Sequence, residues 1–119
     1  MKSNCEIKIT AETRISNLVK RFKNAFPFLR IEIFRKGEDI SHDHRDFRLF
    51  EIATIKKPMS FGIDGEMKVS EVESMFWENL GLQVSIYRKM GSSVVETSFT
   101  SQWTLNHQNH KGEEIDFAF

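Results

Sequence analysis

The chain contains little of several residue types, and each shortage excludes a class of protein. Cys5 is the one cysteine in 119 residues, so no internal disulfide can form. No run of eighteen apolar residues occurs, and a membrane-spanning helix is therefore not expected. The opening residues MKSNCEIKITAETR lack the apolar segment of a signal peptide. These absences predict a cytoplasmic protein with no membrane partner.

Signatures of catalysis and of cofactor binding are equally scarce. The six glycines are scattered, so no phosphate-binding loop is predicted, and no nucleophile elbow is present. Cys5 is in phase with Ile7 and Ile9 of an alternating segment, which favours a core position over a nucleophilic one. We therefore predict no cofactor and no catalytic residue, and an enzyme is the weaker hypothesis.

Histidine pairs carry the alternative of a metal-dependent enzyme. His42 and His44 stand beside Asp43 in a polar stretch, and His107 and His110 follow near the end of the chain. A metal site needs three or four ligands at fixed geometry, and neither spacing is an established signature. Solvated histidines are the simpler interpretation.

The most informative feature of the sequence is an internal repeat of residues 9–37 in residues 63–91. The copies read ITAETRISNLVKRFKNAFPFLRIEIFRKG and IDGEMKVSEVESMFWENLGLQVSIYRKMG. With one residue skipped in each, Ile9 matches Ile63, Phe22 matches Phe76, and Ile33 matches Ile86. The period suits one supersecondary unit used twice within a single domain, residues 1–119.

Each copy predicts a strand, a helix and a second strand. Alternation predicts strands at 5–10 and 29–35, and apolar residues at helical spacing predict a helix that ends before Pro27. In the second copy, Ser70-Glu71-Val72-Glu73 has the form of a capping box, and Gly81 is a good C-cap. The terminal segment 115–119 alternates and is interpreted as an edge strand.

Two such units in tandem favour an α+β fold of the ferredoxin-like β-α-β-β-α-β type, with both helices on one face of the sheet. A β-grasp-like fold is the alternative, because residues 63–109 resemble the order of elements in ubiquitin-like proteins. Residues 1–57 carry a net charge of +5 and residues 58–119 a net charge of −5. We expect the basic first helix and the acidic second helix to pair their charges across a shared seam.

The repeated segments Phe34-Arg35-Lys36 and Tyr87-Arg88-Lys89 are candidate binding residues. By alternation Phe34 and Tyr87 point away from the helices, onto the open face of the sheet. Rings flanked by basic side chains bind single-stranded nucleic acid by stacking and phosphate contacts, which makes a nucleic-acid-binding domain an alternative function. The neutral overall charge does not favour it.

Protein–protein association is the leading hypothesis. Trp77 and the terminal Phe117 and Phe119 add apolar surface without an evident place in the core, and the split charge also favours association. The predicted interaction surface comprises Phe34, Arg35, Lys36, Trp77, Tyr87, Arg88, Lys89, Phe117 and Phe119. The partner is either another protein or a second copy of the chain.

The stretches KVSEVESMF, GLQVSIYRKMG and SQWTLNHQN resemble a family of small uncharacterised proteins from gut-dwelling anaerobic bacteria. The likeness covers residues 59–112. It implies a small cytosolic accessory protein, and it implies no activity and no functional residues.

Overall fold

The structure is a computed structural model that describes the backbone of residues 7–118 and the side chains of residues 7–115. Cys5 and Phe119, and the side chain of Phe117, lie outside the described part. The elements follow the chain in this order: β1 (Ile7–Ile9), α1 (Ile15–Ala25), β2 (Leu29–Arg35), β3 (Glu38–Asp39), α2 (Leu49–Ile52), β4 (Phe61–Ile63), α3 (Val69–Leu80), β5 (Gln83–Met90), β6 (Ser93–Glu96), the short 3-10 helix η1 (Ser98–Thr100) and α4 (Leu105–Ala118).

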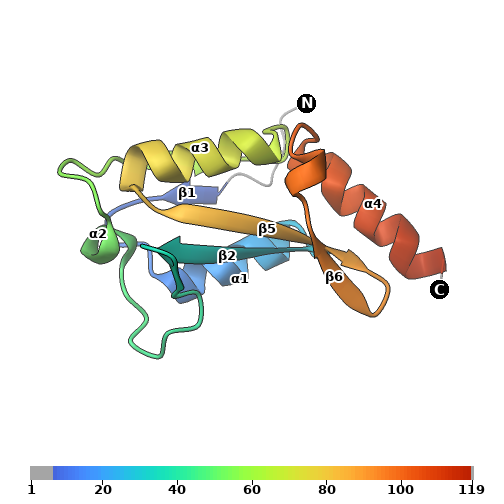
Figure 1. Cartoon of the computed structure of the whole chain (residues 1–119), viewed down its shortest axis with the longest axis horizontal. Helices are drawn as coiled ribbons and strands as arrows, with labels where there is room; N and C mark the ends of the chain where they lie inside the picture. Colours follow the sequence, from blue (N-terminus) through green and yellow to red (C-terminus); the bar gives the residue numbers. More distant parts are fainter. Residues whose placement is uncertain (1–6, 119) are drawn as a thin grey trace.

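The larger sheet has four antiparallel strands in the order β3-β2-β5-β6 (Figure 1). Side chains of β2 and β5 alternate between the core and the other face, as the alternating sequence predicts. Ile31 lies opposite Ile86, and Ile33 lies opposite Val84, with all four side chains buried. This central pair of strands joins the first half of the chain to the second.

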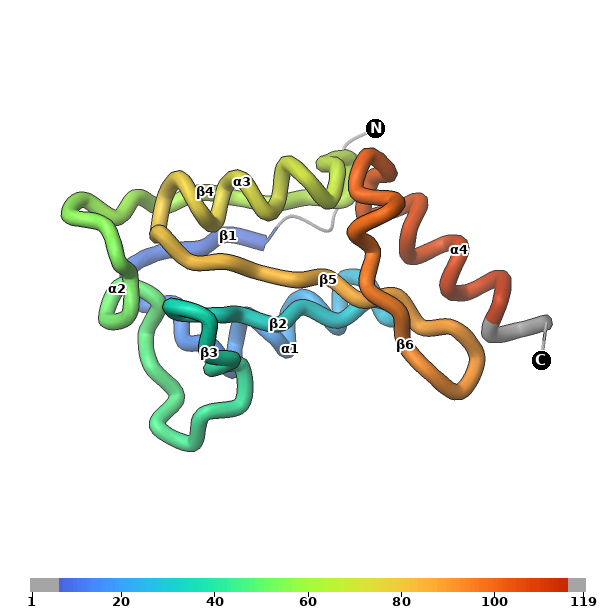
Figure 2. The backbone as a smooth tube through the Cα atoms, in the orientation of Figure 1, coloured from blue at the N-terminus to red at the C-terminus, as the bar shows by residue number. Residues whose placement is uncertain are grey.

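The smaller sheet pairs β1 with β4, again antiparallel, with Ile7 opposite Ile63 and Ile9 opposite Phe61. Figure 2 shows β4 and β1 close to α3 along one edge of the molecule. Ile9 and Ile63 are fully buried, so this short ribbon closes the core.

Helices α1 and α3 bury the apolar stripes that the sequence predicts. Phe22 of α1 and Phe76 of α3 are both fully buried, and the Phe76 ring meets that of Phe61 edge-on at 5.1 Å. Gly81 ends α3 in the left-handed conformation (φ 69°), and its N–H donates to the carbonyls of Phe76 and Trp77. The predicted C-cap is confirmed, because glycine adopts this conformation without steric cost.

The N-terminal cap of α3 differs from the predicted box. The helix begins at Val69, and the carboxylate of Glu71 accepts the Lys68 N–H at 2.8 Å. A capping glutamate stands three residues after the N-cap, and that position here is Glu71 rather than Glu73. Glu73 therefore does not cap the helix.

The predicted edge strand at 115–119 is wrong for the described residues, since the chain is helical from Leu105 to Ala118. Leu105, Gln108 and Gly112 form the buried face of α4. Gly112 allows a close approach, because a Cβ there would lie 2.8 Å from the Cβ of Phe28. An amide and a glycine give no hydrophobic periodicity, so the sequence pattern did not indicate this helix.

The α+β class is confirmed, but the ferredoxin-like arrangement is not. That fold places its second and fourth strands at opposite edges of one sheet. Here the corresponding strands, β2 and β5, pair with each other, and β1 and β4 form a separate sheet. The β-grasp alternative requires a last strand after residue 105, where α4 lies instead.

The predicted charged seam between the two long helices is also not found. In Figure 1, α3 runs along the upper edge, α1 lies behind β2, and β1 and β5 run between them in this view. No ion pair among residues 7–115 joins α1 to α3. No helix in the described part of the chain has the length and apolar character needed to cross a membrane.

Adjacent residues of α3 provide a test of the core. We expect Phe76→Ala to lower the free energy of unfolding by about 3–5 kcal/mol, because a fully buried ring is replaced by a cavity. The neighbouring Trp77→Ala, at a side chain that is 62% exposed, should change it by less than about 0.5 kcal/mol. Urea denaturation measures both, and equal effects would contradict this packing.

Candidate functional site

The two aromatic-Arg-Lys segments each divide between the faces of the larger sheet. Phe34 and Tyr87 lie half-buried on the face away from the core, as predicted. The Arg30 guanidinium lies over the Tyr87 ring, 5.1 Å from its centre, and also 3.5 Å from the Glu32 carboxylate. This face therefore carries both signs of charge.

The arginines of these segments make contacts within the protein instead. Arg35 Nε donates to the Ile52 carbonyl of α2 at 3.1 Å. Arg88 Nη1 donates to Gln108 Oε1 of α4 at 2.9 Å, and its guanidinium lies 5.5 Å from the centre of the Trp103 ring. Each arginine thus connects the central sheet to the helix that follows it in sequence. The nucleic-acid hypothesis assigned these two side chains to phosphate contacts, whereas here both guanidinium groups donate hydrogen bonds within the protein.

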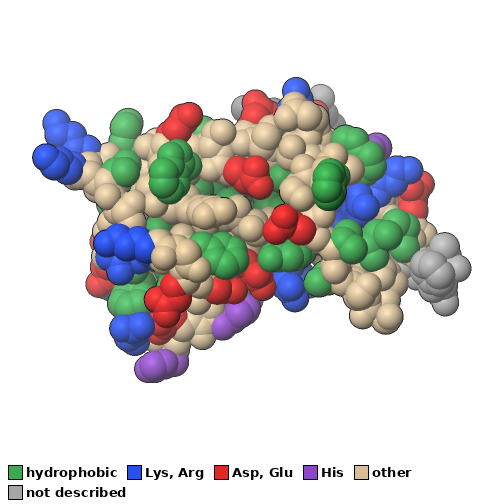
Figure 3. Space-filling model, in the orientation of Figure 1, with side chains coloured by type: hydrophobic (Ala, Val, Ile, Leu, Met, Phe, Trp, Pro, Cys, Tyr) green, Lys and Arg blue, Asp and Glu red, His purple; other side chains and the backbone are tan. Residues whose placement is uncertain are grey.

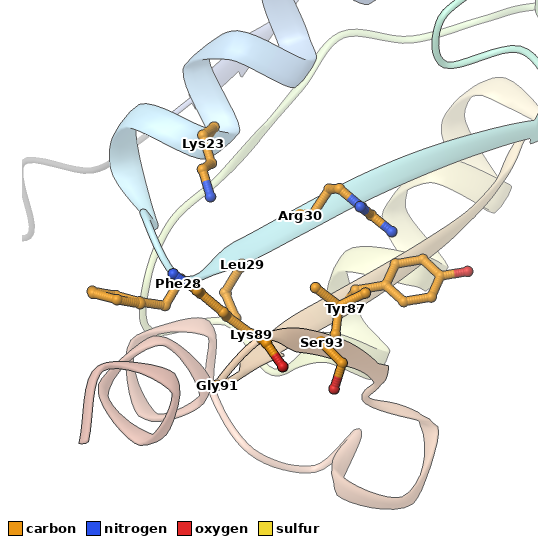
Figure 4. Close-up of a pocket in the computed structure, with 10 residues that line it drawn as sticks. Lys23, Phe28, Leu29, Arg30, Tyr87, Lys89, Gly91 and Ser93 are labelled. Carbon is orange, nitrogen blue, oxygen red and sulfur yellow. The ribbon is translucent and has the colours of Figure 1, made fainter. Parts of the chain in front are cut away.

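Lys36 and Lys89 have different surroundings. Lys36 is exposed and forms, with Gly37, a two-residue turn in which both φ angles are positive (51° and 85°). Lys89 lies half-exposed on β5 and lines a cavity of about 400 Å³ together with Arg30 and Tyr87. Figure 4 shows this cavity bounded by residues of α1, β2, β5 and the β5–β6 turn.

A second hollow, which we call the α3 groove, lies between α3 and the strands β5 and β6. It has a volume of about 540 Å³. The groove is lined by Ser70, Glu73, Ser74, Trp77, Glu78, Gln83, Val84, Ser85 and Glu96. No Lys or Arg is among these lining residues, so the groove is acidic around the exposed Trp77 ring.

The carboxylates of the α3 groove influence one another. Partial burial, together with the charge of Glu96, raises the pKa of Glu73 above its usual value of 4.5. Burial also raises the pKa of Tyr87, and the nearby carboxylates of Glu32 and Glu96 add to the shift. No hydrogen bond or ion pair within the described residues engages the Glu73 carboxylate. A cation would find a favourable electrostatic environment here.

Apolar side chains continue this surface beyond the groove. Phe99 on η1 is fully exposed, and Val94 of β6 is 42% exposed. Figure 3 shows hydrophobic side chains interspersed with acidic ones over this face of the molecule. Trp77 was predicted from the sequence, whereas Phe99, Val94, Glu73 and Glu96 were not. Phe99 could have been noticed as an aromatic among the polar residues Thr97, Ser98 and Thr100.

A comparable hollow beside α1, the α1 groove, has a different charge pattern. Its volume is about 530 Å³, and its helical wall carries Lys20 and Lys23. Its loop wall contains two aspartates with partners of their own. Asp43 binds the Arg45 guanidinium at 2.7 Å, and hydrogen bonds from Arg45 hold the pKa of Asp43 well below its usual value. Asp46 accepts the Ser16 N–H at 2.9 Å, which lowers its pKa.

The histidine pairs lie on separate elements. His42 and His44 are exposed in the loop before α2, and His107 and His110 are exposed on α4. The His107 ring meets that of Trp103 edge-on at 4.5 Å. In residues 7–115, no group of three or more His, Cys, Asp or Glu side chains is placed to hold a metal ion.

No protein-family model, curated protein or solved structure matches this chain.

The Arg88 contact gives a test of how α4 is held. We expect Arg88→Met to cost about 2 kcal/mol, because it leaves the fully buried Gln108 amide oxygen without its charged donor. Amide hydrogen exchange in residues 105–115 should speed up more than in α1. Arg30→Met, which removes a more exposed guanidinium, is the control and should leave α4 exchange unchanged.

The raised pKa of Glu73 predicts a pH-dependent gain in stability for Glu73→Gln. A carboxyl whose pKa is higher in the folded protein destabilises the fold once it ionises, so removing its charge should raise the free energy of unfolding at pH 7. The gain should disappear as the pH falls below 4.5, where wild-type Glu73 is protonated in both states. Urea titrations between pH 3 and pH 7 measure this, with the exposed Glu78→Gln as control. A gain that is independent of pH would contradict the assignment.

Proposed function

We propose that this chain is a small protein-interaction module whose binding surface is the α3 groove and the adjoining apolar side chains of β6 and η1. The observation that carries the proposal is the exposed Trp77 ring beside carboxylates that lack cationic partners within the described residues. Aromatic residues are enriched at the centres of protein interfaces. Covering most of this ring would stabilise a complex by roughly 3 kcal/mol.

Surface composition favours a protein partner over nucleic acid. The open face combines Arg30 and Lys89 with Glu32 and Glu96, so it has no consistent positive potential for a phosphate backbone. Arg35 and Arg88 are engaged by α2 and α4. The likeness of residues 59–112 to small proteins of gut anaerobes adds to this proposal an accessory role in the cytoplasm.

The interaction module is, in our proposal, a duplicated unit with an approximate two-fold axis. Glu32 and Ser85, which the repeat matches, lie opposite each other at the middle of the β2–β5 pairing. Corresponding backbone hydrogen bonds support the duplication. Leu49 N–H donates to the Thr13 carbonyl at 2.8 Å, and Leu105 N–H donates to the Met67 carbonyl at 2.9 Å. The α1 and α3 grooves are then equivalent places, with Lys23 where the second copy has Trp77.

Capture of partners by a tagged chain tests the proposed surface. Proteins retained by the wild type from an extract of its source cells should be lost with Trp77→Ala/Phe99→Ala, with affinity falling about 10- to 100-fold, as truncation of central aromatic residues predicts. Met59→Ala is the matched control, because Met59 is also 62% exposed but does not line the α3 groove. Identical recovery by the wild type and the double variant would overturn the surface assignment.

A further inference from the structure

Two oppositely charged faces stay unmatched inside the monomer. The exposed face of α1 carries Lys20, Arg21 and Lys23, and the α3 groove carries Glu73, Glu78 and Glu96. The two helices lie on different parts of the molecule, with strands β1 and β5 between them in Figure 1. Among residues 7–115, no ion pair links one set to the other. Within the described residues, these complementary charges therefore form no contact with each other.

We propose that the α3 groove of one copy of this chain binds helix α1 of a second copy. The inference rests on the proposed interaction surface and names its occupant. Helix α1 presents basic side chains along one face, and the groove presents carboxylates together with an aromatic ring. Lysine and arginine side chains are attracted both to carboxylates and to the face of an indole ring.

The groove offers a cation specific places to bind. Glu73 and Glu96 are close enough for the charge of one to disfavour ionisation of the other. A lysine ammonium placed between them relieves that repulsion and forms a charge-assisted hydrogen bond. Trp77, on the turn of α3 that follows Glu73, offers its ring to the methylene stem of the same side chain.

Competing charges on the α1 side are already engaged. In the α1 groove, Asp43 is paired with Arg45, and Asp46 caps the N-terminus of α1 through Ser16. Lys20 and Arg21 are exposed. Lys23 donates to the Pro27 carbonyl at 2.7 Å, a surface contact that a carboxylate can replace. Contacts of α1 with α1, or of α3 with α3, would bring like charges together. The favoured contact is therefore between α1 and α3.

Charge reversal on each face, alone and combined, tests the contact. Wild-type protein should associate in a concentration series followed by light scattering, and added salt should weaken this association. Lys20→Glu/Lys23→Glu and Glu73→Lys/Glu78→Lys should each lower self-affinity at least 10-fold. An equimolar mixture of the two variants should associate again, because each supplies the face that the other lacks. Lys56→Glu/Lys57→Glu is the matched control for Lys20→Glu/Lys23→Glu, because it changes the net charge by the same amount in the exposed loop after α2. This control should associate as the wild type does.

Three results would overturn the proposal. The first is a wild-type chain that stays monomeric throughout the series. The second is loss of association in Glu73→Lys/Glu78→Lys but not in Lys20→Glu/Lys23→Glu, which would place the cations that bind the groove outside α1. The third is a mixture that stays monomeric although both variants retain the wild-type circular dichroism and urea midpoint. If a monomeric wild type nevertheless loses a captured partner on Trp77→Ala/Phe99→Ala, the interaction surface stands and only its occupant is wrong.

Discussion

The pairing of β2 with β5 is the contact on which the rest of this structure depends. It joins two halves of the chain that are far apart in sequence, and its core side places Ile31 opposite Ile86 and Ile33 opposite Val84. Antiparallel neighbours of this kind gain both ladder hydrogen bonds and cross-strand packing. Helices α1 and α3 cover that apolar face through Phe22 and Phe76. A slip of one residue would turn the buried side chains to solvent, so this register fixes both the core and the composition of the open face.

The same strands also position the helices that follow them. Arg35 and Arg88 leave β2 and β5 at corresponding places and donate to α2 and α4 respectively. The buried Gln108 amide then donates to the Thr100 carbonyl, which ties η1 to α4. Hydrogen bonds therefore hold the segment that carries Phe99 in place. A partner that covered this ring would lose little binding free energy to ordering of the backbone.

Alternation and helical spacing predicted the strands β1, β2, β4 and β5 and the helices α1 and α3, because these elements bury apolar side chains at regular intervals. The sequence pattern did not predict helix α4, because the buried face of this helix includes Gln108 and Gly112, which are not hydrophobic side chains. The predicted capping box has the right chemistry but lies two residues too late in the sequence, because Glu71 holds the position assigned to Glu73. Strand order and the expected helix seam depend on which strands meet, and a period in sequence does not contain that information. Of the proposed interaction surface, only the aromatic residues Trp77 and Phe99 carried a signal in the sequence, and only Trp77 was predicted from it.

The two grooves, which we propose to be equivalent, differ in charge and in aromatic content. Where α1 has Lys23, α3 has Trp77, and where α1 has Val19, α3 has Glu73. Glu73 lowers folding stability at neutral pH, because its carboxylate is partly buried near Glu96, whereas the exposed Trp77 ring contributes little to folding. Substitutions that lower folding stability persist when they improve binding, and binding sites are where such local conflicts concentrate. In the contact that we propose, the carboxylates and the exposed ring of the α3 groove favour a cationic side chain with an apolar stem, and α1 carries such side chains in Lys20 and Lys23.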